Sequence, residues 1–240
     1  MLRNASAIHY TSQAEKLRTE TSLKLNHGNV VPLGIDFPID DSLQDHETFE
    51  VAFPKFSRQP FVLVMSRLDP KKGIPTLIKS FLSLKTQAQF CEWQLVIAGD
   101  GKPEYVQYLK QTVQELNGTD SVHFTGWLSG DKKISLLRNA ELLALTSYQE
   151  NFGICVMEAM ACGVPVVVSS HVDLSAEVAG AKAGWVVDVD DESIKRSLEE
   201  ALSNEDERAS RGQAGLRLAK NYCWERIGNE LSEMYSFIAG

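Results

Sequence analysis

The sequence predicts an α/β fold: a parallel sheet of about six strands with helices on both faces. Apolar, strand-like runs recur from residue 61 onward, and segments with helical periodicity lie between them. Near-continuous apolar strands that alternate with helices are typical of a parallel sheet buried on both faces. The predicted strands are residues 61–65, 94–98, 122–124, 142–145, 165–168 and 185–187.

Apolar residues at helical spacing predict the helices that connect these strands. One helix follows the first strand and carries on one face Ile74, Leu77, Ile78, Phe81 and Leu82. Another begins near Pro103, a residue suited to the first helical turn, and continues with Val106, Leu109, Val113 and Leu116. Residues 190–240 read as three helical segments with no strand between them.

The part of the chain before residue 61 differs in character from the rest. Residues 7–11 can form a short strand, and Ser12 with Glu15 fits a capping box at the start of a helix. Residues 29–35 give one more strand-like run. Residues 36–60 are acidic, contain proline and show no periodicity, which predicts a connector.

The composition is that of a folded globular protein. Of the 240 residues, 43% are hydrophobic and 23% are charged, which excludes collagen-like, low-complexity and disulfide-scaffold classes. The net charge of −8 argues against a general nucleic-acid or anionic-membrane binder, because such proteins need a basic surface. Any phosphate site must therefore come from a local cluster of cations.

We expect a cytoplasmic chain without a membrane segment. The longest apolar runs are too short to span a bilayer, and residues 1–4 do not begin a signal peptide. The four cysteines form no C-x-x-C pair, and three of them lie in apolar segments. This pattern indicates structural thiols in a reducing compartment.

Open parallel sheets bind ligands at the carboxyl ends of their strands, so the residues after each strand are candidates for a site. After the first strand, Arg67, Lys71 and Lys72 precede a helix start, an arrangement that either holds phosphate or forms a solvated, capped loop. After the second strand, Gly99 and Gly101 form G-x-G without the third glycine of a dinucleotide fingerprint. We therefore expect a tight turn that a ligand can approach closely, and not a nicotinamide site.

Two glutamates follow the fourth strand, eight residues apart. Glu150 lies in the loop and Glu158 about a turn and a half into the next helix, so both can face one pocket, with an anion near the amides of residues 152–154. Ionised carboxylates only accept hydrogen bonds, which suits a ligand rich in hydroxyl groups. By spacing alone the pair is a weak signal, because surface carboxylates are common.

Several segments, taken in order, give the sequence a close resemblance to a known family. They are Ser66-Arg67-Leu68-x-x-x-Lys72-Gly73, Ala98-Gly99-Asp100-Gly101, Phe124-Thr125-Gly126 and Glu150-x-Phe152-Gly153-x-x-x-x-Glu158-Ala159-Met160-Ala161-x-Gly163-x-Pro165-Val166-Val167. Together they resemble the carboxy-terminal, donor-binding domain of GT4-type (group 1) retaining glycosyltransferases, which have the GT-B fold. The resemblance runs from residue 61 to about residue 235, and residues 5–15 resemble the end of the family's acceptor-binding domain.

The resemblance implies a Rossmann-like donor domain over residues 61–240, preceded by a remnant of the acceptor domain and a connector over residues 1–60. It implies transfer of a sugar from a UDP-, GDP- or ADP-linked donor to an unidentified acceptor, with retention of anomeric configuration. The nucleotide-sugar is a substrate, and neither a cofactor nor a metal is needed, because cations and helix dipoles take that role. The missing acceptor domain would come in cis or from a partner chain.

The family pattern also implies roles for individual residues. Arg67 and Lys72 would hold the donor diphosphate and, with Glu150 at the sugar hydroxyls, form the catalytic group. Glu158 would accept hydrogen bonds from the ribose hydroxyls. The other expected donor contacts are Phe152, Gly153, Ile154, Gly126, Trp127, Leu128, Gly99 and Gly101.

The sequence departs from the family in two ways. Ser66 stands where the family usually has glycine, and most of the acceptor domain is absent, with its glycine-rich loop and histidine. A nucleotide-sugar binding subunit that is inactive without a partner, and a nucleotide-sugar epimerase, therefore stay open as alternatives. We also expect the face toward the missing half to be apolar and to favour self-association.

One further motif suggests a different chemistry. Asp188-Val189-Asp190 spells the D-x-D of a metal-using glycosyltransferase fold. Because it precedes a helical segment, capping of that helix by Asp190 or Asp191 is the better interpretation.

Overall fold

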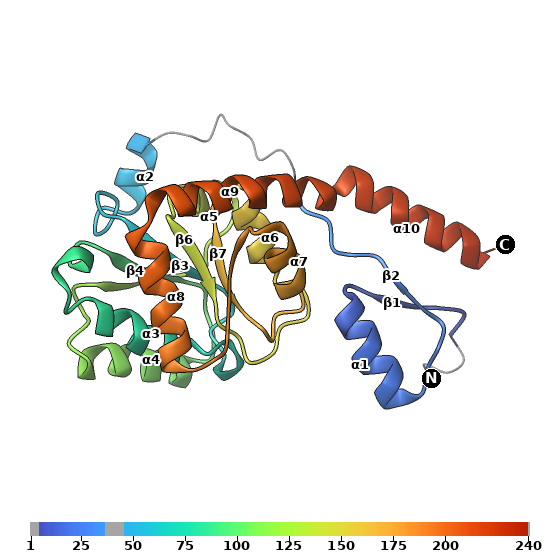
Figure 1. Cartoon of the computed structure of the whole chain (residues 1–240), viewed down its shortest axis with the longest axis horizontal. Coiled ribbons are helices and arrows are strands. Elements are labelled where there is room, and N and C mark those ends of the chain that lie inside the picture. The colour runs from blue at the N-terminus through green and yellow to red at the C-terminus, as the bar shows by residue number, and fades with distance from the viewer. Residues whose placement is uncertain (1–4, 37–45, 240) are drawn as a thin grey trace.

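The computed structural model of the chain describes residues 5–36 and 46–239 and contains two parallel sheets (Figure 1). The strands of the larger sheet are β3 (Phe61–Met65), β4 (Gln94–Ala98), β5 (Val122–Gly126), β6 (Leu142–Leu145), β7 (Val166–Ser169) and β8 (Gly184–Val187). Their spatial order is β5-β4-β3-β6-β7-β8, and all neighbours pair in parallel. The predicted fold class is confirmed.

The order of the strands reverses at the centre of the sheet. β3 pairs with β6 through Val62–Leu142 and Leu63–Leu143, and the remaining strands extend outward from this pair on either side. The loops that leave the carboxyl ends of β3 and β6 therefore lead to opposite faces of the sheet. In open α/β sheets this is the position at which ligands bind.

Helices cover both faces of this sheet. They are α3 (Ile74–Leu84), α4 (Pro103–Glu115), α5 (Gly130–Arg138), α6 (Ile154–Ala161), α7 (Ser175–Ala181), α8 (Asp191–Ser203) and α9 (Glu205–Ala219). Buried residues of α3, α4 and α8 pack on one face, and those of α5, α6, α7 and α9 pack on the other. In β3, Val62 and Val64 face the first group of helices, whereas Leu63 and Met65 face the second.

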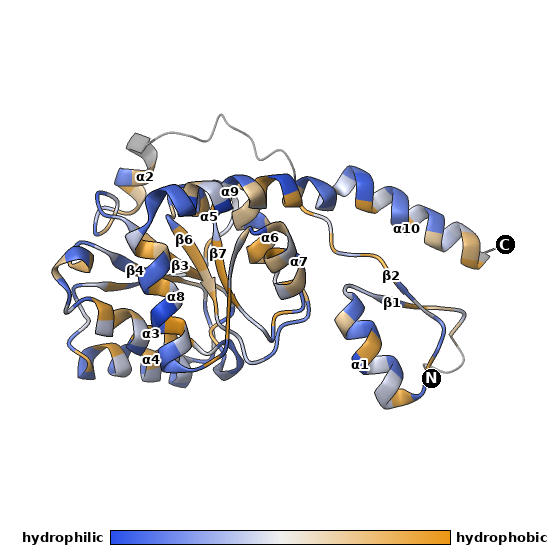
Figure 2. Ribbon diagram, in the orientation of Figure 1, coloured by the Kyte–Doolittle hydropathy of each residue, from blue (hydrophilic) through white to orange (hydrophobic). Residues whose placement is uncertain are grey.

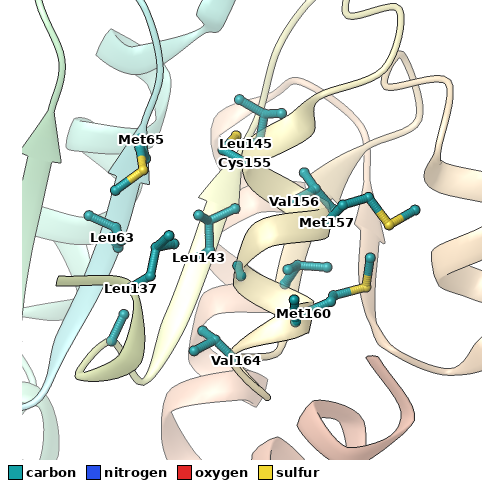
Figure 3. Close-up of a cluster of buried hydrophobic side chains, with 14 of the residues drawn as sticks. Leu63, Met65, Leu137, Leu143, Leu145, Cys155, Val156, Met157, Met160 and Val164 are labelled. Atoms are coloured by element: carbon teal, nitrogen blue, oxygen red, sulfur yellow. The ribbon is translucent and has the colours of Figure 1, made fainter. Parts of the chain in front are cut away.

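The core on the α6 side is shown in Figure 3. Leu63 of β3 lies beside Leu137 of α5, and Leu143 of β6 lies between Leu63 and the α6 residues Val156 and Met160. Figure 2 shows how hydropathy varies along the ribbon: apolar residues lie on β6 and β7, and hydrophilic residues lie along much of α9. No helix in the described part of the chain is both long enough and apolar enough to cross a membrane.

The predicted amphipathic helices are confirmed, except that Leu116, expected on the apolar face of the second, is the C-cap residue of α4 and is exposed. α3 buries Ile74, Leu77 and Phe81 against the sheet, and Pro103 occupies the first turn of α4. The three helical segments predicted over residues 190–240 are α8, α9 and α10 (Trp224–Ala239), with a short 3₁₀ turn at Lys220–Tyr222 between the last two. Two further 3₁₀ turns lie at Pro70–Lys72 and Ala88–Phe90. Figure 1 shows that α10 runs from the larger sheet toward the side on which the smaller sheet lies.

The smaller sheet belongs to the amino-terminal part of the chain. It consists of β1 (Ile8–Tyr10) and β2 (Gly28–Val30), joined by helix α1 (Gln13–Leu23). The Ser12 hydroxyl accepts a hydrogen bond from the amide of Glu15 at 2.9 Å, as predicted. The Glu15 carboxylate, however, accepts from the amide of Thr11 at 2.8 Å, so only half of the capping box forms.

Helix α1 is joined to the larger domain by a small polar network. The carboxylate of Asp173, whose side chain is 4% exposed, accepts from the Ser12 hydroxyl at 2.6 Å and from the Arg18 guanidinium at 2.7 Å. The side-chain amide of Asn151 donates to Glu15 at 3.1 Å. The network therefore connects α1 to the loops that follow β6 and β7.

One prediction for the segment before β3 is wrong. Residues 36–60 were expected to form an aperiodic connector, but residues 46–52 form helix α2 (His46–Ala52). Phe49, Phe53 and Phe56 are buried, and the ring centroids of Phe56 and Phe61 lie 5.5 Å apart. The i, i+4, i+7 spacing of these rings is helical, although acidic flanks and Pro54 obscure it.

Part of the early sequence lies outside the described residues. This applies to residues 1–4, where no signal peptide was expected, and to residues 37–45 of the expected connector. The domain boundary between residues 60 and 61 stays a prediction.

Candidate functional site

A cavity of about 400 Å³ opens at the carboxyl edge of the larger sheet, where the loops after β3 and β6 diverge. It brings together most of the predicted site residues: Arg67, Lys72, Gly99, Trp127, Leu128, Glu150, Gly153, Ile154 and Glu158. The other residues that line it are Met65, Ser66, Ala98, Lys133, Leu145 and Cys155.

Two glycines allow the strand ends to approach each other closely around the cavity. A Cβ atom on Gly99, at φ +141°, would lie 1.8 Å from the carbonyl oxygen of Ser66. A Cβ atom on Gly73, at φ +64°, would lie 2.3 Å from the carbonyl oxygen of Thr146. Only glycine fits at these contacts, so the ends of β4 and β6 can both lie against the loop that follows β3.

Two cations of the loop after β3 line the cavity, one in an ion pair and the other without one among the described residues. The ammonium of Lys72 donates to the carboxylate of Glu150, and the two side chains are 12% and 20% exposed. Arg67 is exposed and makes no ion pair with any described residue, although it lines both this cavity and an adjoining polar one. The Arg67 guanidinium is therefore available to an anion that enters the cavity.

A second ion pair also lines the cavity. Nζ of Lys133, on α5, donates to Oε1 of Glu158, on α6, at 2.5 Å. The sequence analysis did not identify Lys133. A signal was present, because Lys133 lies three and four residues before the buried Leu136 and Leu137 and so shares the inward face of α5.

The amino-terminal end of α6 faces the cavity. Gly153 is the N-cap residue of this helix, and Gly153, Ile154 and Cys155 all line the wall. A helix start carries partial positive charge and free amide donors, so it favours an anionic ligand. Burial, with Glu150 and Glu158 nearby, raises the pKa of the Cys155 thiol to about 12, so this group is neutral at physiological pH.

Three predicted residues are not among those that line the cavity. Phe152 is 4% exposed and packs against Tyr222, with ring centroids 6.0 Å apart, so its side chain anchors the loop from within the core. Gly101 pairs with Leu68 in the turn after β4. The carbonyl of Gly126 accepts a hydrogen bond from the amide of Gly99 at 2.8 Å.

The D-x-D segment serves the helix, as the capping interpretation predicts. The Asp190 carboxylate accepts from the amides of Glu192 and Ser193 at 3.1 and 2.8 Å and caps α8. Within the described ranges, no three His, Cys, Asp or Glu side chains are grouped in a way that could hold a metal ion.

Comparison with known proteins identifies the family. The model of the family "Glycosyl transferases group 1" matches residues 45–217, a range that includes every residue of the cavity. The chain belongs to the group 1 glycosyltransferases. The resemblance found in the sequence motifs is thereby confirmed.

Several curated relatives of this glycosyltransferase chain are also similar in sequence. A D-inositol 3-phosphate glycosyltransferase of Salinispora arenicola is 32% identical over 180 residues, which cover 72% of this chain and 40% of the relative. The mannosylfructose-phosphate synthase of Agrobacterium fabrum is 27% identical over 230 residues, which cover 91% of this chain and 50% of the relative. The chain therefore spans about half the length, or less, of these relatives.

Solved structures of glycosyltransferases share the fold. The sucrose-phosphate synthase of Thermosynechococcus elongatus superposes with a TM-score of 0.85 at 24% identity, over 100% of this chain and 60% of that one. Anabaena Alr3699/HepE, solved in complex with UDP and glucose, gives a TM-score of 0.86 at 21% identity, over 98% and 64%. Both matches support the GT-B fold.

Proposed function

We propose that this chain is the donor-binding half of a retaining glycosyltransferase that takes its sugar from a nucleotide-sugar. The observation that carries the proposal is the charge pattern of one cavity. In a chain of net charge −8, Arg67, Lys72 and Lys133 converge there with two carboxylates and a helix start. A volume of about 400 Å³ also falls within the usual range for a small-molecule site.

The cations and the start of α6 fit the diphosphate of the donor. Arg67 and Lys72 lie on the loop after β3, and the first residues of α6 line the same cavity. When the bond between sugar and diphosphate breaks, negative charge collects on the departing nucleotide. Groups already placed around that charge lower the barrier, because they need no reorganisation.

The two carboxylates fit the hydroxyl-rich parts of the donor. Glu158 would accept hydrogen bonds from the ribose hydroxyls, and Glu150 would accept them from the transferred sugar. Trp127 and Leu128 would border the base. That HepE was solved with UDP and glucose supports a uridine nucleotide as the first donor to test. No metal or cofactor is part of the proposal, so a chelator should leave donor binding unchanged.

The rest of the enzyme must supply the acceptor site. The chain spans about half the length of its curated relatives, and a partner domain, in cis or on another chain, would hold the acceptor. The same fact favours the alternative of a binding subunit that is inactive by itself. The cytoplasm is the proposed location, in keeping with four cysteines that are all free thiols.

Calorimetry against UDP-, GDP- and ADP-linked sugars tests the proposal. We expect one nucleotide family to bind, with the nucleoside diphosphate retaining most of the affinity of the nucleotide-sugar. Lys79→Ala is a matched control, because Lys79 is an exposed cation on α3 away from the cavity. Absence of binding to every nucleotide, or binding unaffected by loss of Arg67, would contradict the proposal.

A further inference from the structure

We propose that Lys133 is a positioning residue for the ribose-binding carboxylate, Glu158, and that it determines how strongly the site prefers ribose over 2′-deoxyribose. The inference rests on the proposed function and deepens it. Nothing in the family motifs of the sequence includes Lys133. Its role is inferred from the ion pair that it forms with Glu158 at the wall of the cavity.

Only one of the two carboxylate oxygens of Glu158 accepts a hydrogen bond from a described side chain. Lys133 Nζ binds Oε1 at 2.5 Å, and no described residue donates a hydrogen bond to Oε2. A carboxylate that recognises the vicinal hydroxyls of ribose needs a free oxygen with a fixed direction. The pair therefore orients Glu158 without occupying the oxygen that would accept from the sugar.

Partial burial makes this orientation effective. The side chains of Lys133 and Glu158 are 27% and 19% exposed, and each is held on a helix that packs against the core. Water competes less for such a pair than for one on the open surface. Since both helices are fixed by buried residues, the carboxylate has a defined position before the ligand arrives.

Lys133 also neutralises the negative charge of Glu158. Glu150 is already paired with Lys72, so loss of Lys133 would leave Glu158 as an uncompensated carboxylate in a cavity proposed to take a diphosphate. That carboxylate would repel the phosphates and would be free to adopt other rotamers. Both effects weaken a ribonucleotide, but only the second removes the preference for the 2′-hydroxyl.

The experiment measures binding of a nucleoside diphosphate and of its 2′-deoxy counterpart by calorimetry, using the base that the wild-type chain binds best. The variants are Lys133→Met, Lys133→Arg, Glu158→Gln and the double variant Lys133→Met/Glu158→Gln. Lys132→Met is the matched control, because Lys132 is the exposed neighbour of Lys133 on α5. Circular dichroism confirms that each variant is folded.

We expect Lys133→Met to lower the ribose preference by about tenfold, the scale of one charge-assisted hydrogen bond. Lys133→Arg should restore most of it, and Lys132→Met should not change it. In the Glu158→Gln background, Lys133→Met should have no further effect on the preference, because the group that it positions is gone. A merely structural role would instead weaken both nucleotides equally.

Different results overturn different statements. If the wild-type chain binds no nucleotide, the proposed function fails, and this inference fails with it. If Glu158→Gln abolishes the ribose preference but Lys133→Met retains it, the proposed function stands and the role of Lys133 is wrong. Tighter ribonucleotide binding by Lys133→Met would show that the lysine blocks Glu158 and would also overturn the inference.

Discussion

Arg67 and Lys72 line the cavity from the same loop, but only Lys72 forms an ion pair with a described residue. Replacing Arg67 by Ala should weaken binding of a nucleoside diphosphate by about 1.5–3 kcal/mol, the scale of a charge-assisted hydrogen bond, and leave the nucleoside almost unaffected. Lys72→Ala should cost at least as much, because it also leaves the Glu150 carboxylate unpaired beside the phosphates. Calorimetry with Lys79→Ala as control measures both, and an equal loss for the nucleoside would refute the assignment.

Changing Glu158 or Glu150 to Gln should affect the binding of different parts of the donor. Glu158→Gln should weaken the free nucleotide and the nucleotide-sugar alike, because both contain the ribose. Glu150→Gln should not weaken the free nucleotide, and it should reduce the discrimination between different sugars on one nucleotide. Competition binding with a panel of sugars tests this, with the exposed Glu104→Gln as control. A Glu150 variant that loses plain UDP or GDP binding would show that the two roles are reversed.

The site residues that could be predicted are those that follow the carboxyl end of a strand. Arg67, Lys72, Glu150 and Glu158 follow strand ends, and parallel strands bring their carboxyl ends to one edge, so their convergence could be anticipated. Lys133 could not be assigned in this way, because its place depends on how α5 packs against α6. The sequence likewise does not distinguish a loop side chain that faces a ligand from one that anchors the loop, as Phe152 does.

The segment that follows helix α2 packs on the edge strand β5 through a histidine, so its stability should depend on pH. The His123 ring stacks on Phe56 at 5.3 Å between ring centroids and hydrogen-bonds to Gln94 at 3.0 Å. Burial, and secondarily the charge of Lys55, lowers the pKa of His123 from its ordinary value of 6.5. The folded state therefore binds the proton less readily than the unfolded chain does.

The sign of the effect follows from this difference. Above the unfolded pKa of 6.5 the contribution of the neutral ring is fully present, and it is lost as the pH falls toward the lower folded pKa. We expect the free energy of unfolding in urea to decrease between about pH 7.5 and pH 5.5, and to decrease less in His123→Gln. The exposed His171→Gln should behave as the wild type does. Equal pH dependence in all three proteins would contradict the prediction.

At the level of elements, the strands and the long amphipathic helices could be predicted, because each carries its own periodicity. Helix α2 was missed because it is short and its apolar spacing continues past Pro54, beyond the last helical turn. The capping box at Ser12 formed only in part because the carboxylate of Glu15 has a competing donor in the amide of Thr11. A sequence pattern indicates the residues that can pair, and tertiary geometry decides between neighbours one residue apart.

The chain as a whole should bind a donor but transfer no sugar. The larger sheet provides the cavity, while the described residues before residue 61 contribute a two-stranded sheet and the helices α1 and α2. Holding an acceptor in place can account for about 7–11 kcal/mol of a barrier, and an open site is also wet, which weakens its electrostatic contacts. Incubation with the best-binding nucleotide-sugar and a panel of acceptors should give no glycosylated product. Turnover in the usual enzyme range of about 1–10³ per second would show that the chain is a complete catalyst.

The whole-molecule architecture was predictable only for the larger domain. Alternating apolar strands and helices indicate a parallel sheet, but the order of its strands, with β3 and β6 at the centre, came from the structure. The placement of β1, α1 and β2 against the larger sheet depends on long-range contacts such as the network around Asp173, whose partners Ser12 and Arg18 lie more than a hundred residues away in sequence. No local pattern predicts such a contact.

The central pairing of the sheet has a consequence for how the protein folds. Val62 and its partner Leu142 are separated by 80 residues of chain, so this pairing closes a long loop and is expected to form slowly. Arg67 and Lys72 come from one side of that pairing, and Glu150 and Glu158 from the other. The binding cavity therefore does not exist until the two halves of the sheet have joined. A nucleotide cannot assist the steps before this pairing forms, but once bound it holds the pairing closed and slows unfolding.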